Sequence, residues 1–369
     1  MAIMQTDHVE VLIDGKVHGN WERYEIDSDL MIPADAWSVS LGMRNGQMPP
    51  GVVEGAPVVV MVGGDTVLTG YVDEISHSLN KTTHTFTMSG RDLAADLLDC
   101  SVPIFSRMQQ SLEEIVAAIT GEFKKTKIRI DADLTYARKK IQTQPGDTAW
   151  NALANAAEAN GLWAWYEPDG TLVVGGPDYS SPIVANLIIR RNGKGNNVIS
   201  LDKSSSHVGR YSTVTVLGQS PGTASEQGRP DLGASWGDKG VLRHRLKIVF
   251  DHEVENDGMC SALAKKLIGD SKVHGLSLTA TVQGHRIVSP GQPFDKKIWQ
   301  PGQRIHIFSE PHGIDGVYFL MARKLTRNRM DGTRTVLTFK EDGIWLAGVH
   351  PHKQHKRGKN VEQLKILEL

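Results

Sequence analysis

Residues 70–101 read GYVDEISHSLNKTTHTFTMSGRDLAADLLDCS, and they carry the most regular pattern of the chain. They predict a strand over Thr66–Ile75, a hairpin, and a second strand over His84–Ser89. In the second strand the phenylalanine and the methionine share one face and the threonines the other, which is typical of a half-buried strand. After Gly90 the apolar residues follow helical spacing, so a short amphipathic helical turn is expected next.

The candidate motif of this stretch consists of Gly90, Arg91, Asp92, Asp96 and Asp99. We predict that Asp92 caps the turn after Gly90 and that Arg91 pairs with a nearby acid. A simpler interpretation is an ordinary strand-to-helix turn, in which Asp92 is an N-cap and Arg91 a solvated charge. Both interpretations are structural, because no metal-binding or nucleophile motif accompanies these residues.

The composition is that of a globular protein with much β structure. Of the 369 residues, 40% are apolar, 22% are charged and 37 are glycine, which is enough chain for two to four domains. The net charge of −1 gives no global field that would favour nucleic acid. The only cysteines, Cys100 and Cys260, are expected to be free thiols. The sequence shows no secretory signal and no long apolar run. We therefore expect a soluble protein that is made in a reducing host cytoplasm and has no membrane span.

The first block, residues 1–98, is predicted to be a small antiparallel β-barrel or sandwich. Besides the two strands above, we expect strands at Val9–Ile13, Trp37–Leu41 and Pro57–Val62. Asp14-Gly15 after the first of them is a hairpin signal.

The second block, residues 99–195, is predicted to be an α+β domain. Ser111-Leu112-Glu113-Glu114 is a capping box at the start of an amphipathic helix. A second helix begins at Asp147 or Thr148 and ends at Asn160-Gly161. Leu162–Tyr166 and Thr171–Val174 then form a hairpin.

The third block, residues 196–345, is predicted to be a second β-barrel-like domain with a helical insertion at about 251–275, the helix being Asp257–Ser271. Residues 218–240 are interpreted as a mobile loop because they are rich in Gly, Ser, Pro and Asp. The expected strands are Tyr211–Leu217, Val241–Phe250, Leu276–Val282, Arg304–Phe308, Val317–Thr326 and Thr333–Lys340. Two barrel-like blocks around an α+β block suggest a duplicated fold, although no repeat of sequence is evident.

Residues 346–369 form a basic, histidine-rich C-terminal tail. A metal could be held by His350, His352 and His355, but a flexible tail loses entropy when it orders and no cysteine or carboxylate is adjacent. We therefore interpret the tail as a partner-binding segment. Its candidate contact residues are His352, Lys353, Lys356, Arg357 and Lys359.

No catalytic, cofactor-binding or metal-binding residue can be assigned from the sequence. P-loop, H-E-x-x-H, C-x-x-C and G-x-S-x-G motifs do not occur. The basic and aromatic residues of 319–329 could contact nucleic acid, but alternation places their charges on one strand face, so a solvated face is the expectation. The chain is accordingly predicted not to be an enzyme and not to bind nucleic acid in a sequence-specific way.

Residues 145–150, PGDTAW, resemble the start of a LysM peptidoglycan-binding module. A LysM repeat would continue with a second helix, whereas residues 162–174 predict a hairpin. A peptidoglycan-binding protein of the tail or cell wall is therefore kept as the alternative function.

The order of motifs resembles the baseplate hub family of Mu-like contractile-tailed phages and prophages, which is related to the late control D tail proteins. Four stretches carry the resemblance: residues 70–101, 147–175, 201–219 and 322–345. Each is a weak to moderate signal, but together they span nearly the whole chain.

The resemblance implies a fold that is mainly β with α+β insertions, and a structural role in the virion tail baseplate. Family members are trimers whose two similar barrels per chain build a pseudo-six-fold ring. This ring adapts the six-fold tail tube to the trimeric, membrane-piercing spike. The implied partners are other copies of the chain, the tail tube protein, the central spike protein and other baseplate proteins.

Overall fold

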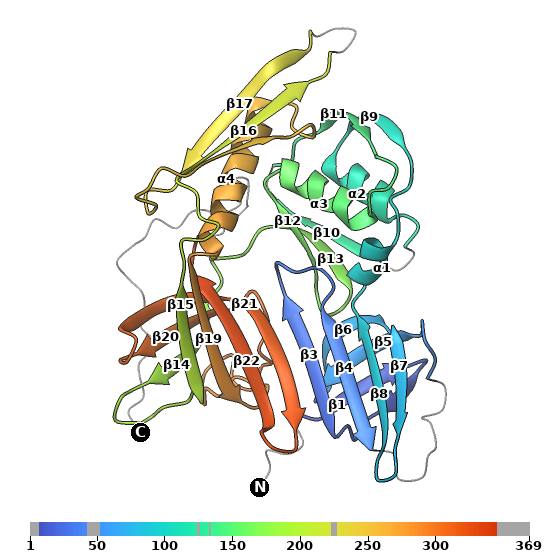
Figure 1. Ribbon diagram of the computed structural model, residues 1–369, viewed down its shortest axis with the longest axis vertical. Coiled ribbons are helices and arrows are strands. Elements are labelled where there is room, and N and C mark those ends of the chain that lie inside the picture. The colour runs from blue at the N-terminus through green and yellow to red at the C-terminus, as the bar shows by residue number, and fades with distance from the viewer. Residues whose placement is uncertain (1–6, 43–51, 124–125, 133, 223–226, 345–369) are drawn as a thin grey trace.

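The structure is a computed structural model that describes residues 7–42, 52–123, 126–132, 134–222 and 227–344. Within these residues the chain is mainly β, with several sheets and four α-helices. This confirms the predicted fold class. Figure 1 shows the long strands of the largest sheet in the lower half of the molecule and the helices in the upper half.

The largest sheet has ten strands, and it joins early and late parts of the chain. Its main path runs β15-β19-β22-β21-β3-β4-β8-β7, while β20 pairs with β21 and β14 with β20. Its strands are β3 (Arg23–Asp29), β4 (Ala36–Gly42), β7 (Glu74–Leu79), β8 (His84–Arg91), β14 (Ile183–Ile189), β15 (Ser200–Ser205), β19 (Leu276–Gln283), β20 (Arg304–Ser309), β21 (Ile314–Asn328) and β22 (Gly332–Glu341). The link between the two halves is the antiparallel pairing of β21 with β3.

A four-stranded sheet of order β2-β1-β5-β6 packs against the early half of the large sheet. Its strands are β1 (Val9–Ile13), β2 (Lys16–His18), β5 (Pro57–Val62) and β6 (Asp65–Tyr71). Every second residue of β1 and β5 is buried, and these side chains share one apolar core with Ile26, Trp37 and Phe86. The strands predicted at Val9–Ile13 and Pro57–Val62 are thus confirmed.

The stretch predicted as one strand, Thr66–Ile75, is two strands in two different sheets. β6 ends at Tyr71 and β7 begins at Glu74. Between them Val72 is buried, and its N–H donates to the Ala56 carbonyl oxygen at 3.0 Å. The single-strand prediction was wrong because the side-chain pattern does not report which strand the backbone pairs with, and the pairing partner changes at this corner.

The α+β region contains three helices, a three-stranded sheet of order β10-β13-β12 and a ribbon of β9 with β11. Its elements are α1 (Ala94–Asp99), β9 (Ser106–Gln110), α2 (Leu112–Thr120), β10 (Lys127–Asp131), β11 (Arg138–Gln142), α3 (Ala149–Ala159), β12 (Trp163–Tyr166) and β13 (Thr171–Gly175). The predicted capping box is present, since the Glu114 N–H donates to Ser111 Oγ and the Ser111 N–H donates to Glu114 Oε2. The predicted hairpin after α3 is confirmed as β12–β13.

The remaining elements are β16 (Thr213–Ser220), β17 (Arg229–Gly237), β18 (Leu246–Phe250) and α4 (Asp257–Val273). The prediction of a mobile loop over 218–240 was wrong for β17, which pairs with β16 over most of its length. Of its side chains only Leu232 is buried, so its stability comes mainly from backbone hydrogen bonds, which composition does not reveal. The strand predicted from Val241 begins only at Leu246, whereas the predicted helix is confirmed as α4.

Candidate functional site at the junction of three regions

Two glycines allow β6 and β8 to approach closely where the 70–101 motif begins. A Cβ atom on Gly70 would lie 1.9 Å from the Arg91 carbonyl oxygen, and one on Gly90 would lie 1.9 Å from the Tyr71 carbonyl oxygen. Gly70 and Asp92 form an isolated antiparallel bridge at this point. Both glycines are therefore required by a backbone contact that any side chain would block.

Arg91 connects the corner between β6 and β7 to helix α1. Its guanidinium donates to Asp99 Oδ2 and to Asp73 Oδ2, each at 2.7 Å. These hydrogen bonds raise the pKa of Arg91, and the bond from Arg91 lowers the pKa of Asp99. The three side chains are between one third and two thirds exposed, so the pairs position α1 more than they stabilise the fold. Nearby, partial burial and the charges of Asp73 and Asp99 raise the pKa of Asp96.

Asp92 is buried directly before α1. Its Oδ1 accepts a hydrogen bond from the Ala94 N–H at 2.9 Å, and its own N–H donates to the Asp35 carbonyl oxygen at 2.9 Å. The N-cap position itself is held by Leu93, which makes no side-chain capping bond. Asp92 thus supports the first turn of α1 from one residue earlier. Burial raises the pKa of its carboxyl to about 7.

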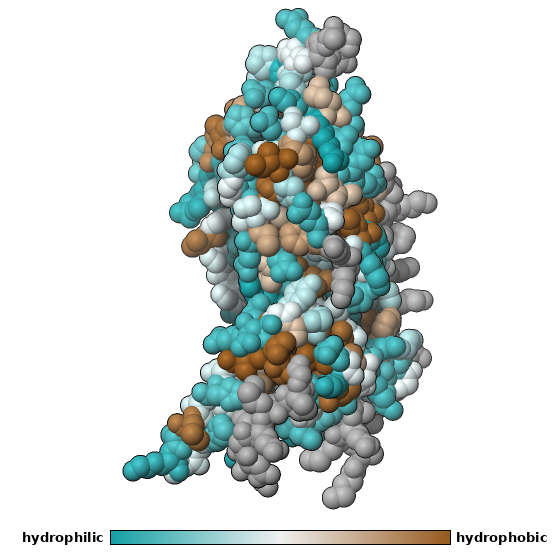
Figure 2. Space-filling model, turned by 90° about the vertical axis from the view of Figure 1, so that its right-hand side faces the viewer, coloured by the Kyte–Doolittle hydropathy of each residue, from teal (hydrophilic) through white to brown (hydrophobic). Residues whose placement is uncertain are grey.

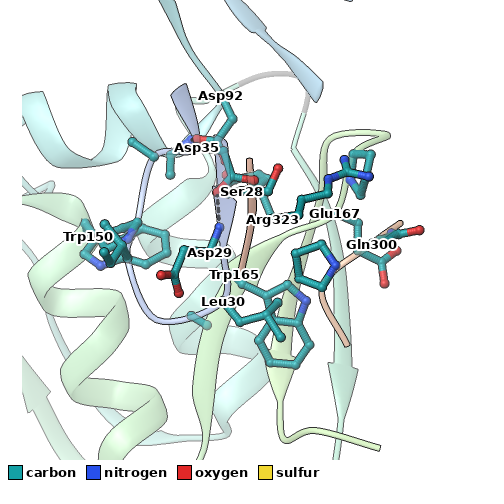
Figure 3. Close-up of a pocket in the computed structure, with 18 residues that line it drawn as sticks. Ser28, Asp29, Leu30, Asp35, Asp92, Trp150, Trp165, Glu167, Gln300 and Arg323 are labelled. Carbon is teal, nitrogen blue, oxygen red and sulfur yellow. Dashed lines mark hydrogen bonds between the residues drawn. The ribbon is translucent and has the colours of Figure 1, made fainter. Parts of the chain in front are cut away.

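A cavity of about 70 Å³ lies beside Asp92, where three regions of the chain meet. Its walls come from the β3–β4 connection, from the hairpin β12–β13, and from Gln300 and Pro301 before β20. Figure 3 shows Asp35, Asp92 and Ser28 close together at one side of it, with Trp165 at another. A cavity of this size has room for a few water molecules.

The charges at the cavity are buried and partly compensate one another. Burial, followed by the charge of Asp92, raises the pKa of Asp35 well above its usual range. Arg323 is fully buried, and desolvation lowers its pKa to about 10. Its guanidinium donates to the carbonyl oxygens of Trp299 and Val67, which ties β21 to the four-stranded sheet and to the segment before β20. Because Asp35 and Asp92 are neighbouring buried carboxyls, their simultaneous ionisation is unfavourable, and near neutral pH the pair retains a proton.

The polar groups near this junction bond neighbouring elements of the fold. In the described part of the chain, no group of three or more His, Cys, Asp or Glu side chains is arranged to hold a metal. Among the described residues the buried histidine is His285, whose two ring nitrogens contact Tyr24 Oη at 2.8 Å and Thr335 Oγ1 at 2.9 Å. Burial lowers the pKa of His285 to about 3, so it remains neutral and links β3 to β22.

Of the five motif residues, only Asp92 lines the cavity. Gly90 lies at the close contact of β8 with Tyr71, Arg91 pairs with Asp99, and Asp96 lies in α1. The candidate tail residues, His352 to Lys359, lie outside the described residues. Sequence reasoning missed Asp35, Arg323 and Ser28. The available signal was the position of Arg323 directly after the apolar run 317–322. Its charge was interpreted as part of a solvated strand face, whereas Arg323 is only 1% exposed.

The ten-stranded sheet, with its junction of glycine contacts, ion pairs and buried polar groups, places the chain in the class of mainly β proteins. Comparison with protein-family models gives four matches in chain order. They are "Mu phage baseplate assembly protein GpP-like, N-terminal" for residues 8–92, "Baseplate hub protein gp44-like, second domain" for 94–176, "Tail protein NMB1110-like, third domain" for 210–268, and "Tail protein, C-terminal domain" for 270–344.

Whole-chain comparisons agree with these matches. The structure of a tail protein from Neisseria meningitidis MC58 is 37% identical, with a TM-score of 0.80 over 93% of this chain and 99% of that one. The 43 kDa tail protein of prophage MuSo2 from Shewanella oneidensis is 22% identical, with a TM-score of 0.76 over 92% and 99% of the two chains. Baseplate hub protein gp44 of Escherichia phage Mu is 22% identical over 95% of this chain and 92% of its own length. The chain belongs to the baseplate hub family of Mu-like phages and prophages, as the sequence resemblance predicted.

Proposed function

We propose that this protein is a structural component of a contractile-tail baseplate and that it forms a homotrimeric hub between the six-fold tail tube and the trimeric spike. The observation that carries the proposal is the full-length match to a tail protein at 37% identity, with the same fold throughout. Its partners would be the tube protein, the central spike protein and other baseplate proteins. It would be made in the bacterial host cytoplasm and end in the virion tail.

The described residues fit a scaffold better than a catalyst. Four titratable groups with strongly shifted pKa values, Asp35, Asp92, His285 and Arg323, bond backbone and side chains of neighbouring elements. We infer that the protein is not an enzyme and uses no cofactor. No helix among the described residues has the length and apolar character to cross a membrane, and Figure 2 shows separate apolar patches on a largely hydrophilic face.

The division of the chain into blocks 1–98, 99–195, 196–345 and 346–369 remains a prediction. In the structure β14, at residues 183–189, pairs with β20 in the large sheet, and β21 pairs with β3 across the first and third blocks. The peptidoglycan-binding alternative gains no support from residues 145–150. They form the turn before α3 and its first two residues, and Trp150 packs in the apolar core of the α+β region.

Sedimentation equilibrium at micromolar concentration tests the hub proposal. We expect a species of three times the chain mass, either alone or in exchange with monomer. A strictly monomeric or dimeric protein at high concentration would contradict the trimeric hub. Binding of the purified protein to peptidoglycan sacculi, with no binding to spike protein, would favour the alternative.

A further inference from the structure

The cavity beside Asp92 is lined by more acidic than basic side chains. Those with a charge are Asp29, Asp35, Asp92, Glu167 and Arg323. Glu167 is already paired, because Arg129 Nη2 donates to its Oε1 at 2.6 Å. Arg323 donates to the carbonyl oxygens of Trp299 and Val67 rather than to a carboxylate. Three aspartates therefore face a single cation.

That cation does not offset the burial of the three aspartates. Burial is the largest cause that raises the pKa of Asp29, of Asp35 and of Asp92. A carboxyl with a raised pKa has too little positive charge and too few hydrogen-bond donors around its ionised form. Ser28, which is 4% exposed, lies close to Asp35, yet its Oγ makes no hydrogen bond of normal geometry within the described residues. The cavity thus suits a group that carries positive charge and N–H donors.

The remaining walls favour an organic cation. They include three aromatic rings and three prolines: Trp150, Trp165, Tyr166, Pro33, Pro168 and Pro301. The planar guanidinium of arginine stacks on aromatic faces and donates two parallel hydrogen bonds to a carboxylate. Among the described residues, no three His, Cys, Asp or Glu side chains are placed to hold a metal. A volume of about 70 Å³ accommodates one side-chain head group in place of a few water molecules.

The described part of the chain ends close to this cavity. Ile344, its last residue, packs against the same apolar cluster as Leu30 and Trp165, and both of these line the cavity. Glu341, at the end of β22, lies opposite Tyr318 of β21, which is about 17 Å from Arg323 at about 3.4 Å per residue. Arg357 lies 13 residues beyond Ile344, and an extended chain of this length spans about 40 Å. The basic part of the C-terminal tail can therefore reach the cavity of its own chain.

We propose that the guanidinium of Arg357 occupies this cavity in the free protein, so that the basic tail is held at the junction of its own chain. The tail has the matching charge, because residues 350–359 contain three lysines, one arginine and no acidic residue. Arg357 is the only arginine after Ile344, and arginine suits aromatic walls and paired carboxylates better than lysine does. The inference does not depend on the hub role. The predicted contact of the tail with the spike would then require release from the cavity.

Disulfide trapping in the full chain tests where the tail lies. The background is Cys100→Ser, which removes the exposed native thiol and leaves the buried Cys260. Ile32→Cys places a thiol at the rim of the cavity, since Ile32 lines it and is 63% exposed. Gly358→Cys places the second thiol next to Arg357 and keeps every basic side chain. Under mild oxidation we expect this pair to form a disulfide within one chain, because a docked tail raises the effective concentration of one thiol at the other.

The matched control is Val208→Cys with Gly358→Cys. Val208 is 80% exposed and does not line the cavity. It is also near the start of the tail, because a Cβ on Gly209 would lie 3.6 Å from the ring of His274, which follows a residue of the cluster that Ile344 contacts. We expect the Ile32 pair to link about tenfold faster than the Val208 pair. Equal rates, or a faster Val208 pair, would overturn the proposal.

Substitutions in the tail and in the cavity identify the occupant. With the Ile32 and Gly358 thiols present, Arg357→Gln should slow the disulfide about fivefold or more. Lys353→Gln removes the same charge outside the cavity and should change the rate by less than about twofold. Asp35→Asn removes a carboxylate but keeps an acceptor for the Asp29 N–H, so it should also slow the linkage. The two tail substitutions lie outside the described fold, so their effects do not depend on whether Asp35→Asn folds.

Two further results would contradict the docking of Arg357 in its own chain. The first is an equal effect of Arg357→Gln and Lys353→Gln, which would overturn the assignment of Arg357. The second is a disulfide between copies, seen as a covalent dimer, which would show that the occupant is the tail of another chain. Sedimentation of the same protein tests the hub separately. A trimer without the Ile32–Gly358 linkage refutes only the docking, and a monomer with that linkage refutes only the hub.

Discussion

At the scale of single residues, the structure gives Asp92 a property that its expected role as a helix cap does not include. As a capping residue its loss would cost about 1 kcal/mol. In the structure Asp92 is buried beside the carboxyl of Asp35, so the free energy of unfolding depends on whether Asp92 is protonated. The stability of the protein should therefore depend on pH in a way that an exposed capping residue would not cause.

We expect the free energy of unfolding to decrease between about pH 4 and pH 7 because of Asp92. Its pKa is about 7 in the folded chain, against 3.8 as the ordinary value. The stabilisation is therefore complete below pH 3.8 and is lost as the pH rises through 7, at about 1.4 kcal/mol per unit of pKa difference as an upper bound. Asp92→Asn keeps an acceptor for the Ala94 N–H and removes the titration, so its denaturant midpoint should vary less across this range. An equal change of the denaturant midpoint with pH in the original protein and in Asp92→Asn would contradict this account.

The glycine at position 90 makes a second prediction at this scale. Gly90→Ala would place a methyl group 1.9 Å from the Tyr71 carbonyl oxygen, so the two strands must separate. We expect a loss of about 3 kcal/mol or more, or failure to fold, because backbone atoms cannot move aside as a flexible side chain can. The control is Gly316→Ala, since the nearest atom to its added Cβ would be 3.8 Å away. Thermal unfolding that is equally affected in both variants would contradict the close-contact explanation.

At the scale of secondary structure elements, one buried lysine links two helices. Lys266 of α4 is 3% exposed, and its Nζ donates to Glu158 of α3 at 2.9 Å and to Asp270 at 2.8 Å. The Trp163 Nε1–H donates to the same Asp270 at 2.8 Å. One polar network therefore spans α3 and α4, and with them the predicted second and third blocks, beside the apolar packing of Ala159 against α4.

We expect Lys266→Met to lower the free energy of unfolding by about 1–3 kcal/mol. The apolar replacement fills the space but leaves Glu158 and Asp270 without their cation; both acids are partly exposed, so water compensates in part. The measurement is the urea midpoint at constant m-value. Lys265→Met is the control, since this neighbouring lysine lies over the Trp236 ring in a cation–π contact outside the Glu158–Asp270 network. A loss no larger than that of the control would show that the network does not stabilise the helix pair.

At the scale of the whole molecule, the C-terminal tail poses the remaining functional question. Residues 350–369 combine the basic run with Leu364, Ile366, Leu367 and Leu369, and this segment lies outside the described residues. Such a composition has too little apolar surface for a core of its own, so we predict that it contacts the spike.

Deleting residues 350–369 should leave the size and the melting curve of the assembly nearly unchanged and weaken spike capture at physiological salt. A full-length control in which His352, Lys353, Lys356, Arg357 and Lys359 are replaced by serine should lose the salt-sensitive part of the association rate. If the truncated and full-length proteins capture the spike equally well, the tail is only a solubilising segment.

The amino-acid sequence by itself determined the local elements and the family. The capping box at Ser111, the helix Asp257–Val273 and the hairpin at 162–174 depend on spacing and on turn residues within a few positions, so they could be predicted. The order of four stretches along the chain, residues 70–101 among them, also indicated the hub family. Within 70–101, the close backbone contact at Gly70 and Gly90 explains why glycine stands at these two positions.

Only the tertiary structure decided which strands pair and which charges are buried. The break at Val72, the strand β17 and the β21–β3 junction all depend on partners far away in the chain, and side-chain alternation is the same whichever partner is chosen. Asp35, Asp92 and Arg323 acquire their shifted pKa values only where separate regions exclude water from one cavity. Pairing and desolvation are properties of segments brought together by folding, and no local pattern in the sequence encodes them.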